Sequence, residues 1–323
     1  MSLHSHNPID CDGAVPYGGP SASHVKKLLA DHSLRPKKRL GQNFLIDGNT
    51  LDRIIAACGV GPGDNVLEIG PGLGVVTRRL AEAGGNVVCV EADKALEPIL
   101  RDALAHVPNA EIVLGDFLKL ELPGFLGAHA AGRWMVVGNL PYYITSPIIT
   151  KLIDSRRIIS RMVLMVQREV ALRLAAKPGS DDYGALSVYV QFYCDIESVM
   201  RVSRNVFYPI PDVDSELVRL TARKRPRAVV EDERLFFAVV RSAFGKRRKT
   251  LFNALASSLL LGWTKDKAGE ALESARIDGN RRGETLSIEE FAAIADAAAK
   301  CSDRRSPNCH WGPDCKSGPN VKP

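Results

Sequence analysis

Short apolar runs alternate with segments of helical periodicity between residues 62 and 166. The runs lie at residues 65–70, 86–90, 111–114, 133–137 and 161–166. Segments with helical spacing follow the first two runs, at residues 75–83 and 94–106. The runs are apolar at consecutive positions, as strands need when helices cover both faces of their sheet. This order predicts parallel strands joined by helices in an open, doubly wound α/β sheet.

The hydrophobic pattern changes in the last third of the chain. Residues 197–202 and 216–222 are typical of strands, whereas residues 185–194 fit a strand or a helix equally well. After Pro226 the strand pattern stops, and helical spacing recurs at residues 235–244, 250–261, 265–275 and 288–299. Ser287 and Glu290 have the spacing of a capping box at the start of the last of these helices. The pattern therefore predicts a domain boundary near residue 225.

The two ends of the chain lack sustained periodicity. Residues 1–36 are rich in Gly, Pro, Ser and His, and we expect a flexible extension with a short helical stretch near residues 24–31. Residues 301–323 are expected to form a disordered tail; their Cys and His residues lack the paired spacing of a zinc site, so no metal is predicted. Between the ends, an α/β domain at 37–225 precedes a helical domain at 226–300.

The overall composition is that of an ordinary soluble protein. Of 323 residues, 45% are hydrophobic and 25% are charged, which excludes fibrous and wholly disordered classes. No uncharged apolar run approaches the length of a membrane span, and the N-terminus lacks the pattern of a secretory signal. The seven cysteines are widely separated, which favours a reducing compartment. We therefore expect a cytoplasmic protein with no membrane partner.

Positive charge is concentrated in one part of the chain. The formal net charge is +6, yet residues 221–260 alone contain ten basic and three acidic residues. The densest cluster comprises Lys246, Arg247, Arg248 and Lys249. A local basic surface beside a nearly neutral body is typical of proteins that bind a polyanion, so these four residues are candidate phosphate contacts.

A glycine-rich turn follows the first predicted strand. Residues 68–74 read EIGPGLG, which places Gly70, Gly72 and Gly74 just before a helix. Such a turn lets the backbone approach a ligand closely at the carboxyl end of a sheet. The dinucleotide fingerprint needs its third glycine at the sixth position, where this chain has Val75, and no P-loop Lys follows. The turn therefore predicts a ligand other than a dinucleotide or a nucleoside triphosphate.

Acidic residues end the next two predicted strands. Glu91 lies at the tip of the second strand, where a carboxylate can accept hydrogen bonds from both hydroxyls of a ribose. Asp116 ends the third strand and can accept from an adenine amine, while the neighbouring Phe117 covers the ring. The adenosine part of S-adenosylmethionine matches these groups without requiring a phosphate site.

The fourth strand ends in the tetrapeptide Asn139-Leu140-Pro141-Tyr142, the most specific signal in the sequence. An adenine amine is a poor nucleophile because its lone pair is delocalised into the ring. The Asn139 side-chain oxygen and the Leu140 carbonyl could accept the amine hydrogens and leave the lone pair available. Pro141 stiffens the turn, and Tyr142 offers a face for stacking of an extruded base. The residues alone thus predict a methyltransferase that acts on the amine of a base.

Five segments together resemble the ribosomal RNA adenine dimethyltransferases of the KsgA type. They read KRLGQNFL at 38–45, GNLPYYITSP at 138–147, FYPIPDVDS at 207–215, AFGKRRKTL at 243–251 and RGETLS at 282–287. The resemblance covers about residues 36–300 in the family's order. It implies a Rossmann-like class I S-adenosylmethionine-dependent methyltransferase domain followed by a small all-helical RNA-binding domain.

The resemblance also implies roles for individual residues. It implies cofactor contacts at Asn43, Leu45, Gly70, Glu91, Asp116 and Asn139. Phe207 is implied to close the second face of the target base, opposite Tyr142. The implied reaction dimethylates the N6 amines of two adjacent adenosines near the 3′ end of small-subunit (16S-type) ribosomal RNA. The implied partner is an immature small subunit, bound by a monomer of this chain during ribosome biogenesis.

Other functions share part of this pattern. Large-subunit RNA adenine methyltransferases of the antibiotic-resistance type use the same cofactor and reaction motifs, but Leu140 and the segments at 207–211 and 247–250 favour the small-subunit enzymes. A DNA adenine methyltransferase is disfavoured because no large target-recognition domain is present. A ribosome-assembly or transcription factor that binds RNA without catalysis is the alternative from another class, and the intact Gly70, Asn139 and Tyr142 count against it.

Overall fold

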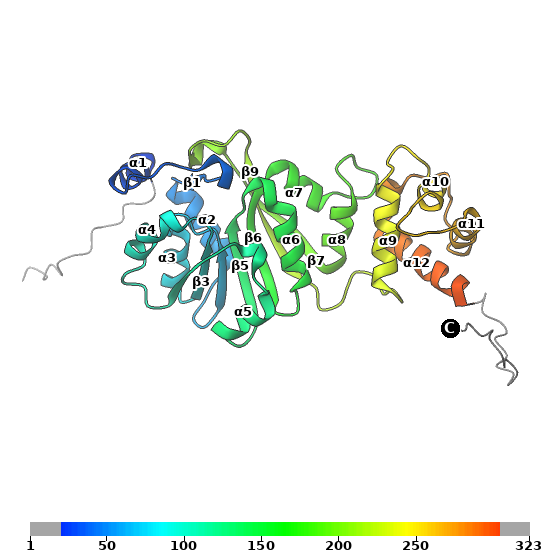
Figure 1. Ribbon diagram of the computed structural model, residues 1–323, viewed down its shortest axis with the longest axis horizontal. Coiled ribbons are helices and arrows are strands. Elements are labelled where there is room, and N and C mark those ends of the chain that lie inside the picture. Colours follow the sequence, from blue (N-terminus) through cyan, green and yellow to red (C-terminus); the bar gives the residue numbers. More distant parts are fainter. Residues whose placement is uncertain (1–20, 304–323) are drawn as a thin grey trace, which may run out of the picture. The chain divides into compact units, whose positions relative to one another are not determined.

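The computed structural model describes residues 21–303, which fold as two compact units, one of residues 21–175 with 193–224 and the other of 176–192 with 225–303. A seven-stranded sheet forms the centre of the first unit, in the order β4-β3-β2-β5-β6-β9-β7 (Figure 1). Strands β2 to β6 are parallel, and β9 runs antiparallel to both β6 and β7. The strands are β2 Asn65–Ile69, β3 Asn86–Glu91, β4 Ala110–Leu114, β5 Trp134–Asn139, β6 Ile159–Gln167, β7 Cys194–Val202 and β9 Ser215–Ala222. Each apolar run predicted to be a strand is one, which confirms the α/β fold.

Helices cover both faces of this sheet, with α2 and α3 on one face and α6 and α7 on the other (Figure 1). The helices of this unit are α2 Gly48–Cys58, α3 Val75–Glu82, α4 Glu97–Ala103, α5 Leu122–His129, α6 Thr145–Asp154 and α7 Arg168–Ala175. Of these six helices, the sequence pattern predicted α3 and α4. Coverage on both faces explains why the strands of the parallel part are apolar at consecutive positions.

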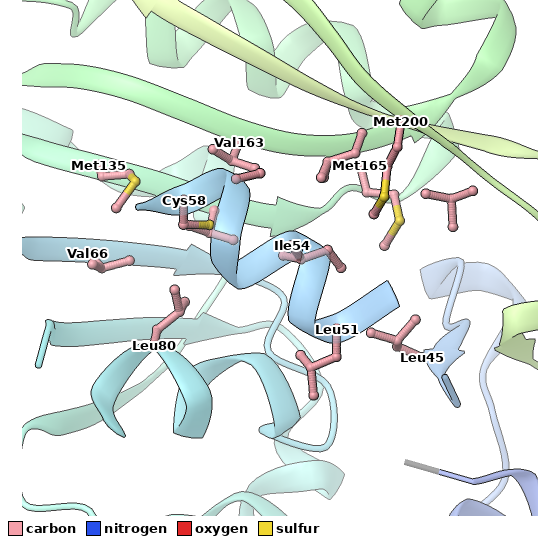
Figure 2. Close-up of a cluster of buried hydrophobic side chains, with 14 of the residues drawn as sticks. Leu45, Leu51, Ile54, Cys58, Val66, Leu80, Met135, Val163, Met165 and Met200 are labelled. Atoms are coloured by element: carbon pink, nitrogen blue, oxygen red, sulfur yellow. The ribbon is translucent and has the colours of Figure 1, made fainter. Parts of the chain in front are cut away.

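One hydrophobic core lies between α2, α3 and the sheet (Figure 2). Leu51, Ile54 and Cys58 of α2 pack in it with sheet residues that include Val66 and Met165. Burying each large aliphatic side chain contributes about 1.5–3 kcal/mol relative to leaving it exposed. The packing of α2 therefore fixes the end of the segment that precedes it, which contains the predicted cofactor residues Asn43 and Leu45.

The N-terminal segment contains the short helix that the sequence predicted near residues 24–31. Helix α1 spans Ala22–Asp31, two residues longer than predicted, and the Ser21 hydroxyl caps its first turn. Val25 and Leu29 of α1 are buried in a cluster with residues of α4. This contact with α4 depends on tertiary structure, so the sequence predicted the helix but not its packing. Residues 1–20 and 304–323, including the rest of the predicted tail, lie outside the described residues.

The second unit is helical in the part that the structure describes. It contains most of α8 (Ala185–Tyr193), together with α9 Glu233–Phe244, α10 Leu251–Ala256, α11 Lys265–Ser274 and α12 Ile288–Asp303. The ambiguous segment at 185–194 is thus a helix, and its Phe192 ring stacks on Phe236 of α9 with ring centroids 4.7 Å apart. This aromatic packing explains why residues 176–192 belong to the second unit, although the sequence placed them in the α/β domain.

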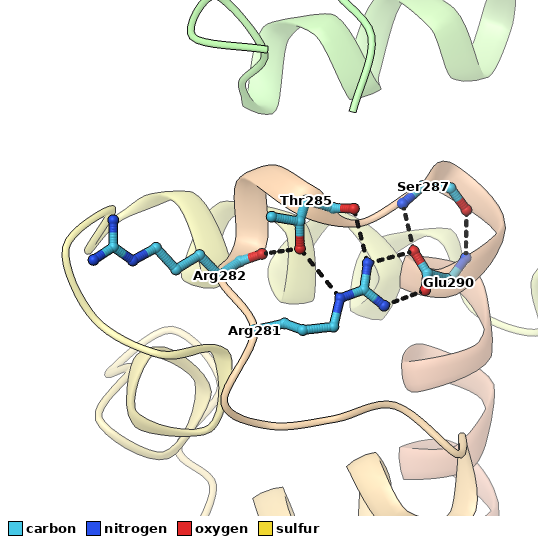
Figure 3. A network of polar contacts seen from close by, with 5 residues as sticks. All are labelled: Arg281, Arg282, Thr285, Ser287 and Glu290. Carbon is cyan, nitrogen blue, oxygen red and sulfur yellow. Dashed lines mark hydrogen bonds and ion pairs between the residues drawn. The ribbon is translucent and has the colours of Figure 1, made fainter. Parts of the chain in front are cut away.

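The predicted capping box begins α12. The Glu290 amide donates to the Ser287 hydroxyl over 3.2 Å, and the Ser287 amide donates to a Glu290 carboxylate oxygen over 2.8 Å. Arg281 also binds this carboxylate and donates to the Thr285 carbonyl over 2.8 Å (Figure 3). The network fixes the turn before α12.

Between residues 21 and 303, no helix is both long enough and apolar enough to cross a membrane.

Candidate active site

A cavity of about 300 Å³ opens at the carboxyl ends of the parallel strands. Five of the six residues predicted to hold the cofactor line it, namely Asn43, Gly70, Glu91, Asp116 and Asn139. The sixth, Leu45, lines a smaller adjoining cavity that also contains Asn43, Gly70 and Asn139. Ligands of open α/β sheets bind at this edge because the loops that follow the strands meet there. The structure thus brings the predicted cofactor residues together.

Gly70 forms an open stretch of the cavity wall. Its backbone has φ +70°, a left-handed conformation that glycine adopts without strain. A Cβ atom built on Gly70 would have no neighbouring atom within 4 Å, so the backbone faces free space. A ligand can therefore approach the main chain at this turn more closely than any side chain would allow.

The Glu91 carboxylate is buried and held by the backbone. One oxygen accepts the Asp93 amide over 2.7 Å, and the other accepts the Gly72 amide over 3.2 Å. Burial raises the pKa of Glu91, while these amides act in the opposite direction. Each carboxylate oxygen can accept a second hydrogen bond. Glu91 is thus fixed in orientation and still has capacity for the two hydroxyls of a ribose.

Asp116 and Phe117 form the part of the cavity beyond β4. One Asp116 oxygen caps the following 3₁₀ turn by accepting the Leu118 amide over 3.0 Å. The Asp116 side chain is otherwise exposed, whereas Phe117 is 5% exposed and lines the cavity. The combination of a carboxylate and an aromatic wall suits an adenine ring.

The N-terminal segment is fastened to the cavity by a network that sequence reasoning missed. Lys37 Nζ lies 2.6 Å from one Asp93 oxygen, and Gln42 Nε2 donates to the other over 2.8 Å. Although burial acts to raise it, the hydrogen bonds from Lys37 and Gln42 hold the pKa of Asp93 below its ordinary value. This network keeps Asn43 against the cavity. Gln42 lies in the segment at 38–45, but nothing in the sequence pairs it with Asp93.

Asn139 and Leu140 present two unused acceptors. The Asn139 amide nitrogen donates to the Asn43 carbonyl over 3.2 Å, which assigns the other end of the amide as the oxygen. The Leu140 amide donates to the Met165 carbonyl over 3.0 Å, which holds the backbone at the tip of β5. Among the described residues, neither the Asn139 side-chain oxygen nor the Leu140 carbonyl receives a hydrogen bond. Both are available to the hydrogens of an amine.

The loop after Leu140 holds Tyr142 in place. The Tyr142 hydroxyl lies 3.0 Å from the Ser215 hydroxyl, and the ring is half-buried. The buried Thr145 hydroxyl donates to the Pro141 carbonyl over 3.0 Å. Ser215 ends the segment at 207–215, one of the five that resemble the family. Its contact with Tyr142 could not be predicted, because it depends on tertiary structure.

Phe207, predicted to contact the target base, is buried in the structure. Strand β8 (Phe207–Tyr208) pairs with β1 (Phe44–Leu45), with Phe207 opposite Leu45. The Phe207 side chain is 1% exposed and packs in the hydrophobic core of Figure 2 with Leu45 and Leu217. In this structure it is a core residue, because the short strand pairing turns its ring inward. A contact of this ring with the target base, opposite Tyr142, stays a prediction.

The four predicted RNA-binding residues, all in the second unit, have different surroundings. Lys246 donates to the Ser257 hydroxyl over 3.0 Å. Arg247 donates to the Asp181 carbonyl over 2.8 Å and lies 3.4 Å from a Glu284 oxygen. Arg248 and Lys249 are exposed, and their side chains have no partner among the described residues. Two of the four are therefore free for phosphate contacts, and Arg247 also stabilises the unit.

The residues around the cavity fit S-adenosylmethionine. An open glycine backbone, a buried carboxylate and a second carboxylate beside an aromatic ring line it in strand order. No basic side chain that could neutralise a phosphate is among the lining residues. The site thus suits an adenosine that carries no phosphate.

Comparisons with known proteins agree with this reading of the cavity. The family model of the ribosomal RNA adenine dimethylases matches residues 33–300. A ribosomal RNA small subunit methyltransferase A from Moorella thermoacetica is 51% identical over 83% of this chain and 94% of its own length. A protein of the same name from Bacillus licheniformis is 47% identical over 84% of this chain and 94% of its own.

Two solved structures share the fold over most of the chain. A dimethyladenosine transferase from Plasmodium falciparum has a TM-score of 0.67 at 26% identity, covering 78% of this chain and 95% of its own. The 23S rRNA methyltransferase ErmE has a TM-score of 0.61 at 28% identity, covering 80% and 100%. The match over residues 33–300 and the identities near 50% lead to one conclusion: the chain belongs to the ribosomal RNA adenine dimethylase family.

Proposed function

We propose that this chain dimethylates the N6 amines of two adjacent adenosines near the 3′ end of small-subunit ribosomal RNA. The observation that carries the proposal is the pair of unused acceptors, on Asn139 and Leu140, beside the cofactor cavity. The relatives at 47–51% identity are named small-subunit methyltransferases, which favours the small-subunit substrate over the large-subunit one. We further propose that it acts as a monomer on immature small subunits, since one chain supplies all of these residues.

The cofactor residues have separable tasks in this proposal. Glu91 binds the ribose, Asp116 and Phe117 bind the adenine, and the Gly70 backbone lies along the remainder of the molecule. Asn43 connects this site to residues 139–142, which we call the reaction loop. Its carbonyl accepts a hydrogen bond from the side-chain amide of Asn139. S-adenosylmethionine supplies the methyl group when it is bound.

The chain activates the target amine through hydrogen bonds. The Asn139 side-chain oxygen and the Leu140 carbonyl accept its two hydrogens, which draws the nitrogen lone pair out of conjugation with the ring. Preorganised acceptors at a reacting centre of this kind contribute about 2.7–4 kcal/mol each. No charged general base is required during attack, since the methylated ammonium releases its proton to water.

Tyr142 positions the base in this scheme. Its hydroxyl is tied to Ser215, so the ring is held as a stacking face for an adenine extruded from the RNA. Stacking of a base on an aromatic ring is worth about 1–3 kcal/mol. Phe207 is given no contact with the base, because it is buried in the core.

Single-turnover methyl transfer by an Asn139→Ala variant tests the mechanism. We expect transfer to fall by at least about 10²-fold, the scale for losing one preorganised group, while RNA affinity stays within a few-fold. Asn86→Ala is the matched control, because Asn86 is exposed at the amino end of β3, away from the cavity. Near wild-type transfer by Asn139→Ala would contradict the mechanism. No transfer by the wild-type protein on immature small subunits would favour a non-catalytic binding protein.

A further inference from the structure

The N-terminal segment of the first unit carries a second concentration of positive charge. Residues 21–40 contain six Lys and Arg residues and one Asp. They form α1 and the 3₁₀ turn η1 (Lys38–Leu40), far along the sequence from the basic cluster of the second unit. Ordinary surfaces mix the two signs of charge, so a segment with so few acidic residues indicates an anionic partner.

Most of these cations have no ion-pair partner among residues 21–303. Lys37 is committed to Asp93, and Lys26 lies over the Tyr208 ring at 5.1 Å from its centroid. The remaining four, Lys27, Arg35, Lys38 and Arg39, are exposed and make no ion pair with any described residue. We call these four residues the N-terminal basic surface.

Part of this surface borders the reaction loop. Gly41 follows η1 directly, and a Cβ atom built on it would lie 3.4 Å from Cβ of Pro141 and 3.8 Å from the Tyr143 ring. Tyr143 lines the mouth of the cofactor cavity and is 60% exposed. Lys38 and Arg39 therefore lie next to the loop that carries Asn139 and Tyr142, beside an exposed aromatic side chain.

The structure holds the segment rigidly at this place. On one side, Val25 and Leu29 of α1 pack in a cluster with Phe44, and Tyr208 packs against the same cluster. On the other side, the hydrogen bonds from Lys37 and Gln42 to Asp93 fasten the residues that flank η1. Charges held in fixed positions lose less entropy on binding than charges on a free tail.

We propose that the N-terminal basic surface binds phosphates of the RNA strand next to the target adenine, with Tyr143 stacking on a neighbouring base. The inference rests on the proposed RNA substrate and adds a contact on the catalytic unit itself. Single-stranded nucleic acids are held by this combination of cations along the backbone and exposed aromatic rings. An acidic protein partner would explain the charges but not the exposed aromatic ring at the mouth of the cofactor cavity.

The test compares two double variants of the full-length protein. Lys38→Ala/Arg39→Ala removes the charges closest to the reaction loop. The control, Arg53→Ala/Arg157→Ala, removes two exposed arginines without partners among the described residues, on α2 and at the amino end of β6. Binding to protein-free small-subunit RNA and to immature small subunits is titrated over a range of salt concentrations. Calorimetry with S-adenosylmethionine reports whether the cofactor site stays intact.

We expect Lys38→Ala/Arg39→Ala to reduce the slope of log K against log salt by about 1.4–1.8, at 0.7–0.9 per phosphate contact, with cofactor affinity unchanged. The control should keep the wild-type slope. Equal slopes of log K against log salt for the two double variants would overturn the inference. A loss seen on small subunits but not on protein-free RNA would overturn it in favour of a ribosomal protein as partner. Methyl transfer by the wild-type protein is measured separately, so failure of the proposed reaction is distinguishable from failure of this contact.

Discussion

Asn139 shows which properties of a single residue the sequence predicts and which depend on the folded structure. Its place at a strand tip, followed by Leu140, Pro141 and Tyr142, predicted an amine site from the sequence alone. The orientation of its amide depends on the Asn43 carbonyl, 96 residues earlier in the chain. Such a contact follows from tertiary structure, so no local pattern could predict it. The chemistry of the residue was therefore predictable, whereas its preorganisation was not.

Glu68 is a second residue whose state depends on the fold. It lies on β2 with its side chain 3% exposed, and the Thr77 hydroxyl of α3 donates to it over 2.5 Å. Burial raises the pKa of Glu68 to about 7, while the Thr77 hydroxyl opposes the shift and the Glu91 charge adds to it. In the sequence, Glu68 is only the first residue of the glycine-rich segment at 68–74, and nothing there indicates its surroundings. Neither its burial nor its raised pKa was therefore predicted.

The raised pKa of Glu68 predicts a pH dependence of stability. Below its unfolded pKa of about 4.5 the carboxyl is neutral in both states, so it has no effect. As pH rises from about 4.5 to 7, the folded state retains a proton that the unfolded state loses, so the free energy of unfolding falls. Above pH 7 the penalty is complete, at about 3 kcal/mol.

Glu68→Gln should remove this penalty, because Gln can still accept from Thr77 without carrying charge. Relative to wild type, we expect its free energy of unfolding in urea to gain about 2 kcal/mol more at pH 8.5 than at pH 5.5. Glu82→Gln, at an exposed position on α3, serves as the control for the same change of residue type outside the core. If the free energies of unfolding of wild type and Glu68→Gln changed equally between pH 5.5 and 8.5, Glu68 would be ionised in the folded protein over this whole range, which contradicts the prediction.

At the scale of elements, strands and long helices were easier to predict than short contacts. The parallel strands consist mainly of apolar residues at consecutive positions, so their positions followed from the sequence. The pairing of β1 with β8 involves only two residues on each side and has no recognisable period. That pairing places Leu45 in the smaller cavity and Phe207 in the core, so the burial of Phe207 could not be predicted for the same reason.

The basic loop between α9 and α10 allows a prediction that separates binding from stability. Arg248→Ala/Lys249→Ala should lower the salt slope of RNA binding by about 1.4–1.8 and leave the melting temperature unchanged, since neither side chain has a described partner. Arg247→Ala should instead lower the melting temperature, because it removes the contacts with Asp181 and Glu284. RNA titrations and thermal melts of the two variants check both effects. Equal effects of the two variants on melting would count against this division of roles.

At the scale of the whole molecule, the sequence predicted the order of strands and helices better than the division into units. The change of pattern near residue 225 coincides with the last crossing between the units. The excursion of residues 176–192 into the second unit was missed, because α8 is apolar on all sides and fits a buried strand as well as a helix. The position of the N-terminal basic surface beside Pro141 and Tyr143 was also not predictable, because it depends on contacts between residues distant in sequence.

The most direct test of the central claim maps methylated adenines in ribosomal RNA. Immature small subunits, and large subunits as the control, are incubated with the full-length protein and labelled S-adenosylmethionine. The account predicts N6,N6-dimethyladenosine at two adjacent positions near the 3′ end of the small-subunit RNA and no label in the large-subunit RNA. It also predicts no label at these positions with Asn139→Ala over the same time. Label in large-subunit RNA, or unlabelled small-subunit RNA with the wild-type protein, would contradict the account.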